Sequence, residues 1–331
     1  MRSFIVRRVL SLVVILAALA TTMFALQHLS PVDPVRAQLG GQASADAVAE
    51  RRQELGLDRP WTAQLGTYLR DVVTGDLGTS YRTRRSVTSD LAAYVPATVE
   101  LTVAALVIAL LLAVLFASSL VLRWPGARLA RGLMLTGATA PAFLLAILGI
   151  VVLYQQLGLF PAGGRSSVLD PPDGPTGMLV LDGVLAGRPG VVGDALMHLV
   201  MPATTIAIAP AVAIGRVLGS RMLADEHSDY ARTARAKGLT ERAILRRHVL
   251  RNTVGSGMSM AGLQVGLMFA GVLVVEQVFA WPGIGQYVAQ SIPVADFPAI
   301  SGVTLLLGVV YVVINALVDI GQAIADPRLT A

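Results

Sequence analysis

Six long runs of apolar residues alternate with polar segments along this chain. A helix needs about 20 mostly apolar residues to cross a hydrocarbon core that is roughly 30 Å thick. The runs of about this length are residues 9–26, 101–122, 133–159, 195–214, 255–275 and 299–318. The pattern therefore predicts an all-α membrane protein with six transmembrane helices.

Prolines interrupt two of the predicted spans. Pro141 falls within the third span, which is long enough to tilt across the membrane. Pro202 and Pro210 fall within the fourth span and remove backbone hydrogen-bond donors from it. We expect the fourth helix to be surrounded by neighbouring helices rather than by lipid, because unpaired backbone groups are costly in hydrocarbon.

The first apolar run also has features of a cleavable signal peptide. Arg2, Arg7 and Arg8 form a basic start, and the sequence Ala-Leu-Ala at residues 18–20 resembles a cleavage site. The apolar run continues past that point to Leu26. We therefore expect residues 1–26 to be kept as an N-terminal span.

The segment between the first two spans, residues 27–98, is polar and is expected on the external side. Residues 44–55 predict a short helix that Gly56 ends. Asp58 is expected to cap a second short helix that Gly75 ends. We interpret this segment as a small external cap that packs on the spans.

The remaining residues, 99–331, are expected to form a five-helix core. Within this core, residues 161–193 are rich in Gly and Pro and predict an irregular external lid. Residues 221–254 predict a loop on the opposite, cytoplasmic side.

The composition agrees with a membrane protein. Of the 331 residues, 54% are hydrophobic and 14% are charged, against roughly 25% charged residues in soluble domains. The chain has no cysteine, which excludes disulfides, thiolate zinc sites and a cysteine nucleophile. It also lacks a basic soluble domain with interleaved aromatic residues, which argues against nucleic-acid binding.

The arginines indicate the orientation of the spans. Basic residues precede the first span, recur at residues 123–131 between the second and third spans, and are dense between the fourth and fifth. Short basic loops stay on the cytoplasmic side, and with six spans these three groups fall on one side. This predicts a multi-pass protein of the cytoplasmic membrane with both termini in the cytoplasm.

A basic stretch at residues 229–252 has the pattern of a short helix that ends in a sharp turn at Gly238. We interpret it as a surface that another protein holds. The alternative is an ordinary basic loop beside anionic lipid headgroups. The candidate contact residues are Asp229, Arg232, Ala234, Arg235, Lys237, Gly238 and Glu241.

A second candidate site follows the fifth span. Glu276 is a carboxylate at the end of an apolar helix, so it should face a polar path, a partner chain or backbone donors rather than lipid. Trp281, Pro282 and Gly283 break the helix, and a short helix over residues 286–292 is expected after the break. We interpret these four residues as a candidate outer gate; a static helix-ending loop is the alternative.

The sequence lacks the chemistry of an enzyme or an ATPase. It has no Gly-rich loop ending in Gly-Lys-Ser/Thr and no Ser or Asp nucleophile signature, and its four histidines show no metal-ligand spacing. We therefore expect no catalytic residue, cofactor or metal site. Ionisable residues are nearly absent from the middle of the spans, which argues against an ion-coupled secondary transporter.

Residues 229–252 resemble the cytoplasmic coupling loop of inner-membrane permease subunits in the dipeptide, oligopeptide and nickel branch of ABC importers. Other short motifs follow in the same order as in that branch. They are Val-Arg-Arg at 6–8, Asp-Pro at 33–34, Leu-Gly-Leu-Asp-Arg-Pro at 55–60, Gly-Asp-Leu-Gly-Thr-Ser at 75–80, Pro-Ala-Thr-Val-Glu-Leu at 96–101, His-Leu at 198–199, Glu-Gln-Val-Phe at 276–279 and Asp-Pro-Arg at 326–328. The resemblance covers nearly the whole chain, and the ordered set is far more specific than any single motif.

The coupling loop departs from the general importer motif, which begins with Glu-Ala-Ala. This chain has Arg232-Thr233-Ala234 at that place. The peptide branch tolerates such variants, so we interpret the difference as a signature of the branch.

The resemblance implies a type I ABC importer permease fold and a permease subunit that moves di- or oligopeptides across the cytoplasmic membrane. It also implies a second homologous permease, two cytoplasmic ATPases that bind ATP and magnesium, and an extracytoplasmic substrate-binding protein. One alternative is the same machine importing nickel chelates or another small solute. The alternative from a different class is an ATP-independent channel or a secondary transporter.

Overall fold

The computed structural model describes residues 2–31, 33–39, 43–54, 56–121, 124–172, 174–226, 228–240 and 250–325. Within these ranges the chain forms helices and no β-strand. It divides into two compact units: Met1–Pro96 with Gly283–Val313, and Ala97–Pro282 with Ile314–Ala331. Two helices, α5 (Val87–Val121) and α14 (Phe297–Ala325), begin in the first unit and end in the second.

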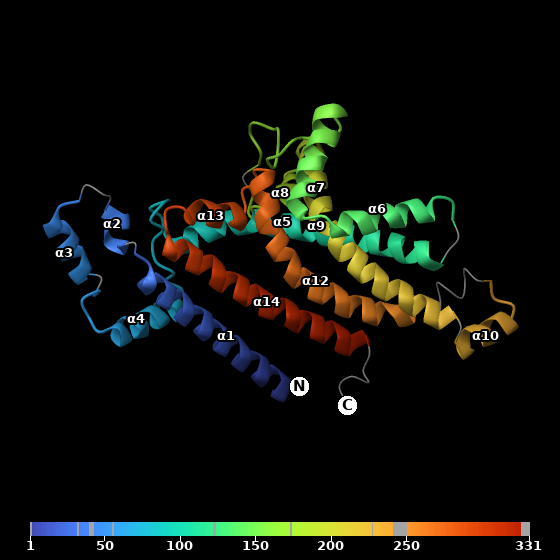
Figure 1. The fold of residues 1–331 in the computed structure, drawn as a ribbon, viewed down its shortest axis with the longest axis horizontal. Coiled ribbons are helices and arrows are strands. Elements are labelled where there is room, and N and C mark those ends of the chain that lie inside the picture. The colour runs from blue at the N-terminus through green and yellow to red at the C-terminus, as the bar shows by residue number, and fades with distance from the viewer. Residues whose placement is uncertain are drawn as a thin grey trace. The chain divides into compact units, whose positions relative to one another are not determined.

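The first unit contains the N-terminal span and the polar segment that follows it. Its complete helices are α1 (Arg2–Leu29), α2 (Pro34–Leu39), α3 (Ala45–Glu54), α4 (Trp61–Thr74) and α13 (Ile284–Ser291) (Figure 1). α4 packs on α1, where the ring centroids of Phe24 and Tyr68 lie 5.8 Å apart. The polar segment therefore folds back onto the first span.

Both short helices that the sequence predicts in the polar segment are present, as α3 and α4. Gly56 and Gly75 follow them with φ angles of 66° and 85°, which end each helix in the left-handed region. The prediction that Asp58 caps the second helix was wrong, because α4 starts without a side-chain cap. The Gln64 amide instead donates hydrogen bonds of 2.9 and 2.8 Å to two carbonyl oxygens in the turn before α4.

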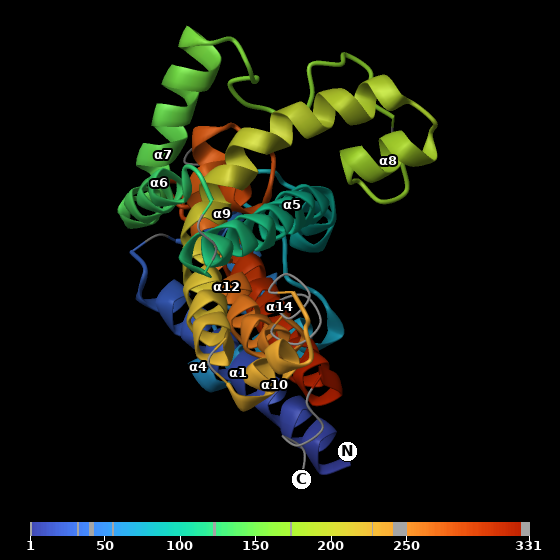
Figure 2. The same ribbon diagram turned by 90° about the vertical axis from the view of Figure 1, so that its right-hand side faces the viewer.

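The second unit contains the other described helices. They are α6 (Ala127–Thr139), α7 (Ala142–Gly149), the π-helical turn η1 (Ile150–Gln156), α8 (Leu179–Leu185), α9 (Pro189–Glu226), α10 (Asp229–Ala236) and α12 (Leu250–Val278). α9 and α12 run side by side, and α6 and α8 pack on α9 (Figures 1 and 2). Residues 161–193 were expected to be irregular throughout, but they contain α8 and the start of α9.

Five described helices are long and apolar enough to cross a membrane. The spanning stretches are Leu10–Leu29, Val87–Val121, Pro189–Ala224, Gly255–Val278 and Phe297–Val318. These stretches confirm, by length and composition, five of the six predicted spans.

The third predicted span is broken. The helix axis bends by 119° between α6 and the helix Ala142–Gln156, which confirms the interruption predicted at Pro141; the sequence did not predict how sharp the bend is. Pro141 immediately precedes α7 and has no N–H to continue the hydrogen-bond ladder of α6. If this bent pair counts as one span, the described residues contain six candidate spans, the number predicted.

Among the five continuous spans, α9 is the most enclosed by protein. In its most apolar window 67% of the residues are buried, against 39% or less in the others. It remains one helix even though it contains Pro202 and Pro210. This agrees with the prediction that the fourth span needs protein around it.

Small residues let α5 and α9 approach closely. Buried small residues recur every four positions on both helices. They are Ala203, Ala207, Ala211, Gly215 and Gly219 on α9, and Ala105, Ala109, Ala113 and Ala117 on α5. A Cβ atom at Gly215 would lie 2.9 Å from the carbonyl oxygen of Ala113, so no side chain fits there. Such close backbone packing is a main source of helix association in lipid.

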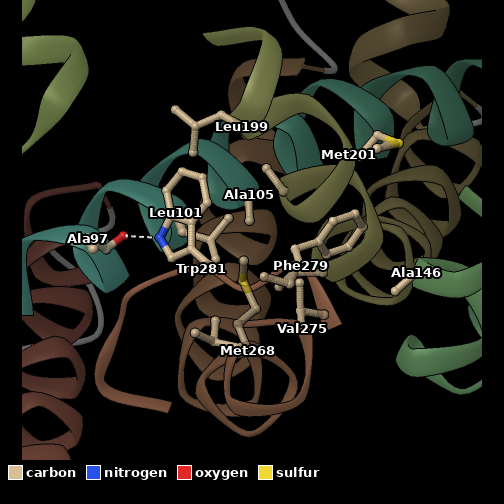
Figure 3. Close-up of a cluster of buried hydrophobic side chains, with 13 residues drawn as sticks. Ala97, Leu101, Ala105, Ala146, Leu199, Met201, Met268, Val275, Phe279 and Trp281 are labelled. Atoms are coloured by element: carbon tan, nitrogen blue, oxygen red, sulfur yellow. Dashed lines mark hydrogen bonds between the residues drawn. The ribbon is translucent and has the colours of Figure 1, made fainter. Parts of the chain in front are cut away.

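The core of the second unit surrounds the end of α12. Phe279 and Trp281 are each 1% exposed and join a cluster of buried residues from α5, α7, α9 and α12 (Figure 3). Leu101 of α5 lies beside the Trp281 ring in this cluster. Trp281 and Phe279, two of the largest fully buried side chains among the described residues, therefore lie where α12 ends.

Replacing Gly215 by valine is expected to destabilise the protein, because the new side chain must enter the contact with the α5 backbone. Overpacking of this kind costs about 1–3 kcal/mol. Thermal unfolding in mild detergent measures the loss. Gly255→Val is the matched control, since a Cβ at Gly255 meets nothing within 4 Å. Equal losses in the two variants would contradict the packing argument.

Candidate functional site

The first candidate site, the coupling segment (residues 229–240), is a short helix that ends at a glycine. Gly238 follows α10 with a φ of 81°, and its N–H donates to the carbonyl oxygen of Arg235 at 2.9 Å. Glycine adopts this left-handed conformation without the strain that other residues incur, which is why the helix ends here. The structure therefore contains the helix and the glycine turn that the sequence pattern predicts.

One ion pair of the coupling segment is exposed and weak. Arg232 and Asp229 form an ion pair at 3.5 Å, with side chains 74% and 98% exposed. An exposed pair of this kind contributes little to stability, so both charges can bind another surface instead. Of the other candidate residues, Lys237 is exposed, Arg235 is half-buried and Ala234 lies within α10. Glu241 lies outside the described residues.

The second candidate site, the α12 exit (residues 276–282), begins with a buried carboxylate. Glu276 is completely buried and accepts a hydrogen bond of 2.6 Å from the Thr98 hydroxyl of α5. Burying a carboxylate is costly unless hydrogen bonds compensate for the lost water. Glu276 is thus held inside the protein and bonded to a neighbouring helix; its part in gating stays a prediction.

Trp281 ties the α12 exit to α5. Its indole N–H donates to the carbonyl oxygen of Ala97 at 2.9 Å, and its backbone N–H donates to the carbonyl oxygen of Glu276 at 2.9 Å (Figure 3). Between them, Ala280 has a φ of 49°, which a residue other than glycine holds only where its surroundings impose it. The two Trp281 bonds supply that constraint.

The last two predicted gate residues fall at a boundary between the compact units. Pro282 ends the second unit, and Gly283 begins a part of the first. Gly283 has an extended conformation with a φ of −111°, so this position does not need a glycine for its backbone angles. The short helix predicted after the break is present as α13, two residues earlier than expected.

A strap (residues 163–165) crosses the α12 exit. The N–H of Gly164 donates to the carbonyl oxygen of Phe279 at 2.8 Å. A Cβ at Gly163 would lie 2.3 Å from the same oxygen, so only glycine allows this approach. The strap therefore binds the irregular backbone that follows α12.

Arg165 anchors the strap by its charge. Its guanidinium lies 2.5 Å from the Glu100 carboxylate of α5 and 5.8 Å from the centre of the Trp281 ring. Glu100 is 8% exposed and also accepts the backbone N–H of Val180 at 2.6 Å. A charge-assisted bond in such a buried place is strong, and losing one partner leaves the other charge buried and unpaired.

Sequence reasoning missed both ends of this ion pair. Glu100 falls inside the motif at residues 96–101, and Arg165 falls in the segment interpreted as an irregular lid. The motif was the only available signal, because no local pattern joins two residues 65 positions apart.

Buried carboxylates also hold α13 within the first unit. The Tyr287 hydroxyl donates to Asp90 at 3.0 Å, and its ring stacks on Tyr94 with centroids 5.0 Å apart. Burial, with the nearby Asp90 charge, raises the pKa of Tyr287 well above its ordinary value, so the hydroxyl remains a donor.

A second buried carboxylate, Asp296, follows α13 and accepts a hydrogen bond of 2.5 Å from the Ser80 hydroxyl. Ser80 ends the motif at residues 75–80, which gave the only sequence signal for this group.

The apolar spans, the broken helix pair and the buried polar contacts at the α12 exit define a multi-pass helical membrane protein. The chain belongs to the family described as the binding-protein-dependent transport system inner membrane component, which matches residues 86–331. The N-terminal region of membrane components of the same systems matches residues 1–102. This family consists of transport permeases, not of enzymes, and has the type I ABC importer permease fold.

Three relatives illustrate the similarity. The chain is 34% identical to the dipeptide transport system permease protein DppB of Alkalihalophilus pseudofirmus, over 99% of each chain. It is 39% identical to the "Probable D,D-dipeptide transport system permease protein DdpB" of Escherichia coli, over 99% of this chain and 97% of that protein. It is 32% identical to the glutathione transport system permease protein GsiC of Salmonella typhimurium, over 99% of each chain.

Replacing Gly163 by alanine is expected to detach the strap from the α12 exit, because the added Cβ displaces the backbone from Phe279. Overpacking against backbone costs about 1–3 kcal/mol, and the local backbone should open more often. Hydrogen exchange measured by mass spectrometry should become faster at residues 161–165 and 276–282. The control is Gly193→Ala, where a Cβ meets nothing within 4 Å. Unchanged exchange at both segments in Gly163→Ala would rule out the strap.

Proposed function

We propose that this chain is a permease subunit of an ATP-driven importer that moves small peptides across the cytoplasmic membrane. The full-length similarity to permeases named for dipeptides and glutathione is the observation that carries this proposal. Those names favour peptides over nickel chelates as the cargo. Membership of the family alone makes the chain a transport permease and does not specify the cargo.

The proposed machine has several other subunits. A second, homologous permease completes the translocation path, an extracytoplasmic binding protein delivers the peptide, and two cytoplasmic ATPases bind ATP and magnesium. This chain binds neither nucleotide nor metal in the proposed mechanism. Both termini and the coupling segment lie in the cytoplasm, where the positive-inside rule favours the basic residues around α10.

The coupling segment transmits the ATPase movement in this proposal. α10 docks in a cleft of an ATPase, and its exposed charges pair with that surface. Gly238 ends the docked helix sharply, so that closure of the ATPases moves α10 as a body. The φ of 81° at Gly238 and the weak pairing of Arg232 support this assignment.

Replacing Gly238 by valine should impair ATP-driven uptake while the protein still inserts in the membrane. A β-branched residue in the left-handed region costs about 1–2 kcal/mol, which displaces the docking helix. Gly238→Asn is the control, since asparagine adopts this conformation more readily, and it should retain most of the uptake. Co-purification of the ATPases with each variant separates lost docking from lost transport. Normal uptake and normal assembly in Gly238→Val would remove the segment from the mechanism.

The function itself is tested in proteoliposomes that contain the purified complex and the binding protein. Uptake of a radiolabelled dipeptide should require ATP and should stop when the catalytic residues of the partner ATPases are disabled. Uptake that persists without active ATPases would identify an ATP-independent channel or a secondary transporter. Uptake of a nickel chelate in place of the peptide would change the cargo and keep the machine.

A further inference from the structure

A half-open cavity of about 250 Å³ lies on the second unit, where the break between α6 and α7 meets α9 and α12. This is many times the roughly 10–15 Å³ that one water molecule needs. The lining residues that matter here are Gly137 and Ala140 beside the break, Thr205 and Pro210 on α9, and Gln264 and Gly271 on α12. None of the residues that line the cavity is ionisable.

Gln264 brings an amide group to this cavity. It lies near the middle of the spanning stretch Gly255–Val278 and is 9% exposed. Within the described part of the chain, its side-chain amide forms no hydrogen bond and is open to the cavity. An unpaired amide inside a membrane span is costly, whereas a leucine of similar volume would cost nothing there. The cavity is therefore lined by a polar group that has no hydrogen-bond partner among the residues that the structure describes.

The neutral lining limits what can bind. An amide carries one acceptor and two donors, which is the same chemistry as a peptide group. The Thr205 hydroxyl donates to the carbonyl oxygen of Met201 at 2.9 Å and can still accept. With no charge in the lining, the cavity suits a neutral amide and offers no opposite charge to a charged terminus or a metal cation.

The helix break and a glycine make room beside Gln264. Irregular backbone within a membrane is tolerated where protein encloses it or where it lines a polar path, and broken helices in transporters commonly border the substrate site. Gly271 lies two turns after Gln264 on the same face of α12. A Cβ at Gly271 would meet nothing within 4 Å, so this position leaves open space.

We propose that this cavity forms part of the cargo route and that the Gln264 amide binds the backbone peptide group of a passing peptide. The inference rests on the proposed function and adds to it a recognition site. Selection here depends on the peptide bond of the cargo and very little on the charge of its side chains.

The test measures uptake kinetics of neutral, acidic and basic dipeptides by the complete complex in proteoliposomes. Gln264→Leu should lower kcat/KM by about three- to tenfold for all three cargoes, the effect of losing one neutral hydrogen bond. Gln264→Asn, which keeps an amide, should restore part of the loss. Thermal stability of Gln264→Leu should be equal or higher, because an unpaired amide is removed; a lower stability would indicate a structural role and overturn the proposal.

Gly271→Val tests the space itself. The added side chain should fill the cavity and reduce uptake of bulky dipeptides more than uptake of diglycine. Two controls lie off the cavity: Leu263→Ala on the exposed face of α12, and Gly132→Val on α6, where a Cβ meets nothing within 4 Å. If both cavity variants behave like these controls while the wild type imports peptides, the cavity is not part of the cargo route, and the proposed function still stands. If the wild type imports no peptide, the proposed function fails.

A labelling experiment separates a polar route from a cavity filled by lipid or by a partner helix. The chain has no cysteine, so Gly271→Cys introduces a single thiol into this subunit. A water-soluble thiosulfonate should modify that thiol in at least one nucleotide state of the assembled complex, and an excess of dipeptide should slow the reaction. Absence of modification in every nucleotide state, with normal uptake, would overturn the proposal.

Discussion

Water does not reach the hydrocarbon interior of a bilayer, so each backbone N–H and C=O inside a span needs a partner from the protein. A continuous helix meets this requirement by itself, but a break in a helix does not. In this chain the requirement explains why polar side chains gather at the α12 exit. Trp281 and Gly164 donate their backbone N–H groups to carbonyl oxygens at the end of α12, and Trp281 adds an indole bond to α5. The irregular backbone is thereby enclosed before it can face lipid.

The same requirement shapes α9. Two prolines remove donors from this helix, and it stays continuous because α6, α8, α12 and the small residues of α5 surround it. Small side chains are needed for that enclosure, since apolar side chains gain little from leaving lipid and helices associate through close backbone contact. The buried small residues at every fourth position of α5 and α9 are therefore as essential to the fold as the large side chains around Trp281.

The local features of this structure could be predicted from the sequence, but few of the contacts between distant residues could. Spans follow from composition over about 20 residues, and the turn at Gly238 follows from helix periodicity with one glycine, so both could be predicted. Pro141 indicated an interruption, but its 119° angle depends on packing against other helices. The Glu276–Thr98 and Glu100–Arg165 contacts join residues far apart in the chain, so no period or spacing reveals them. The unpaired amide of Gln264 could not be found either, because burial and missing partners become visible only in three dimensions.

The two candidate sites differ in how firmly their polar groups are bound within the chain. Those of the α12 exit form buried hydrogen bonds, whereas the ion pair of the coupling segment is exposed. In the coupling segment the ion pair between Arg232 and Asp229 is exposed and weak, so both charges can bind another surface. α9 ends at Glu226 and α10 begins at Asp229, so α9 is the helix that precedes the coupling segment in the chain. At 1.5 Å per residue, the 38 residues of α9 span about 57 Å as one continuous helix. α9 also contributes Pro210 to the wall of the Gln264 cavity. In the proposed function, a single helix would therefore connect the region next to the docked ATPase with that wall.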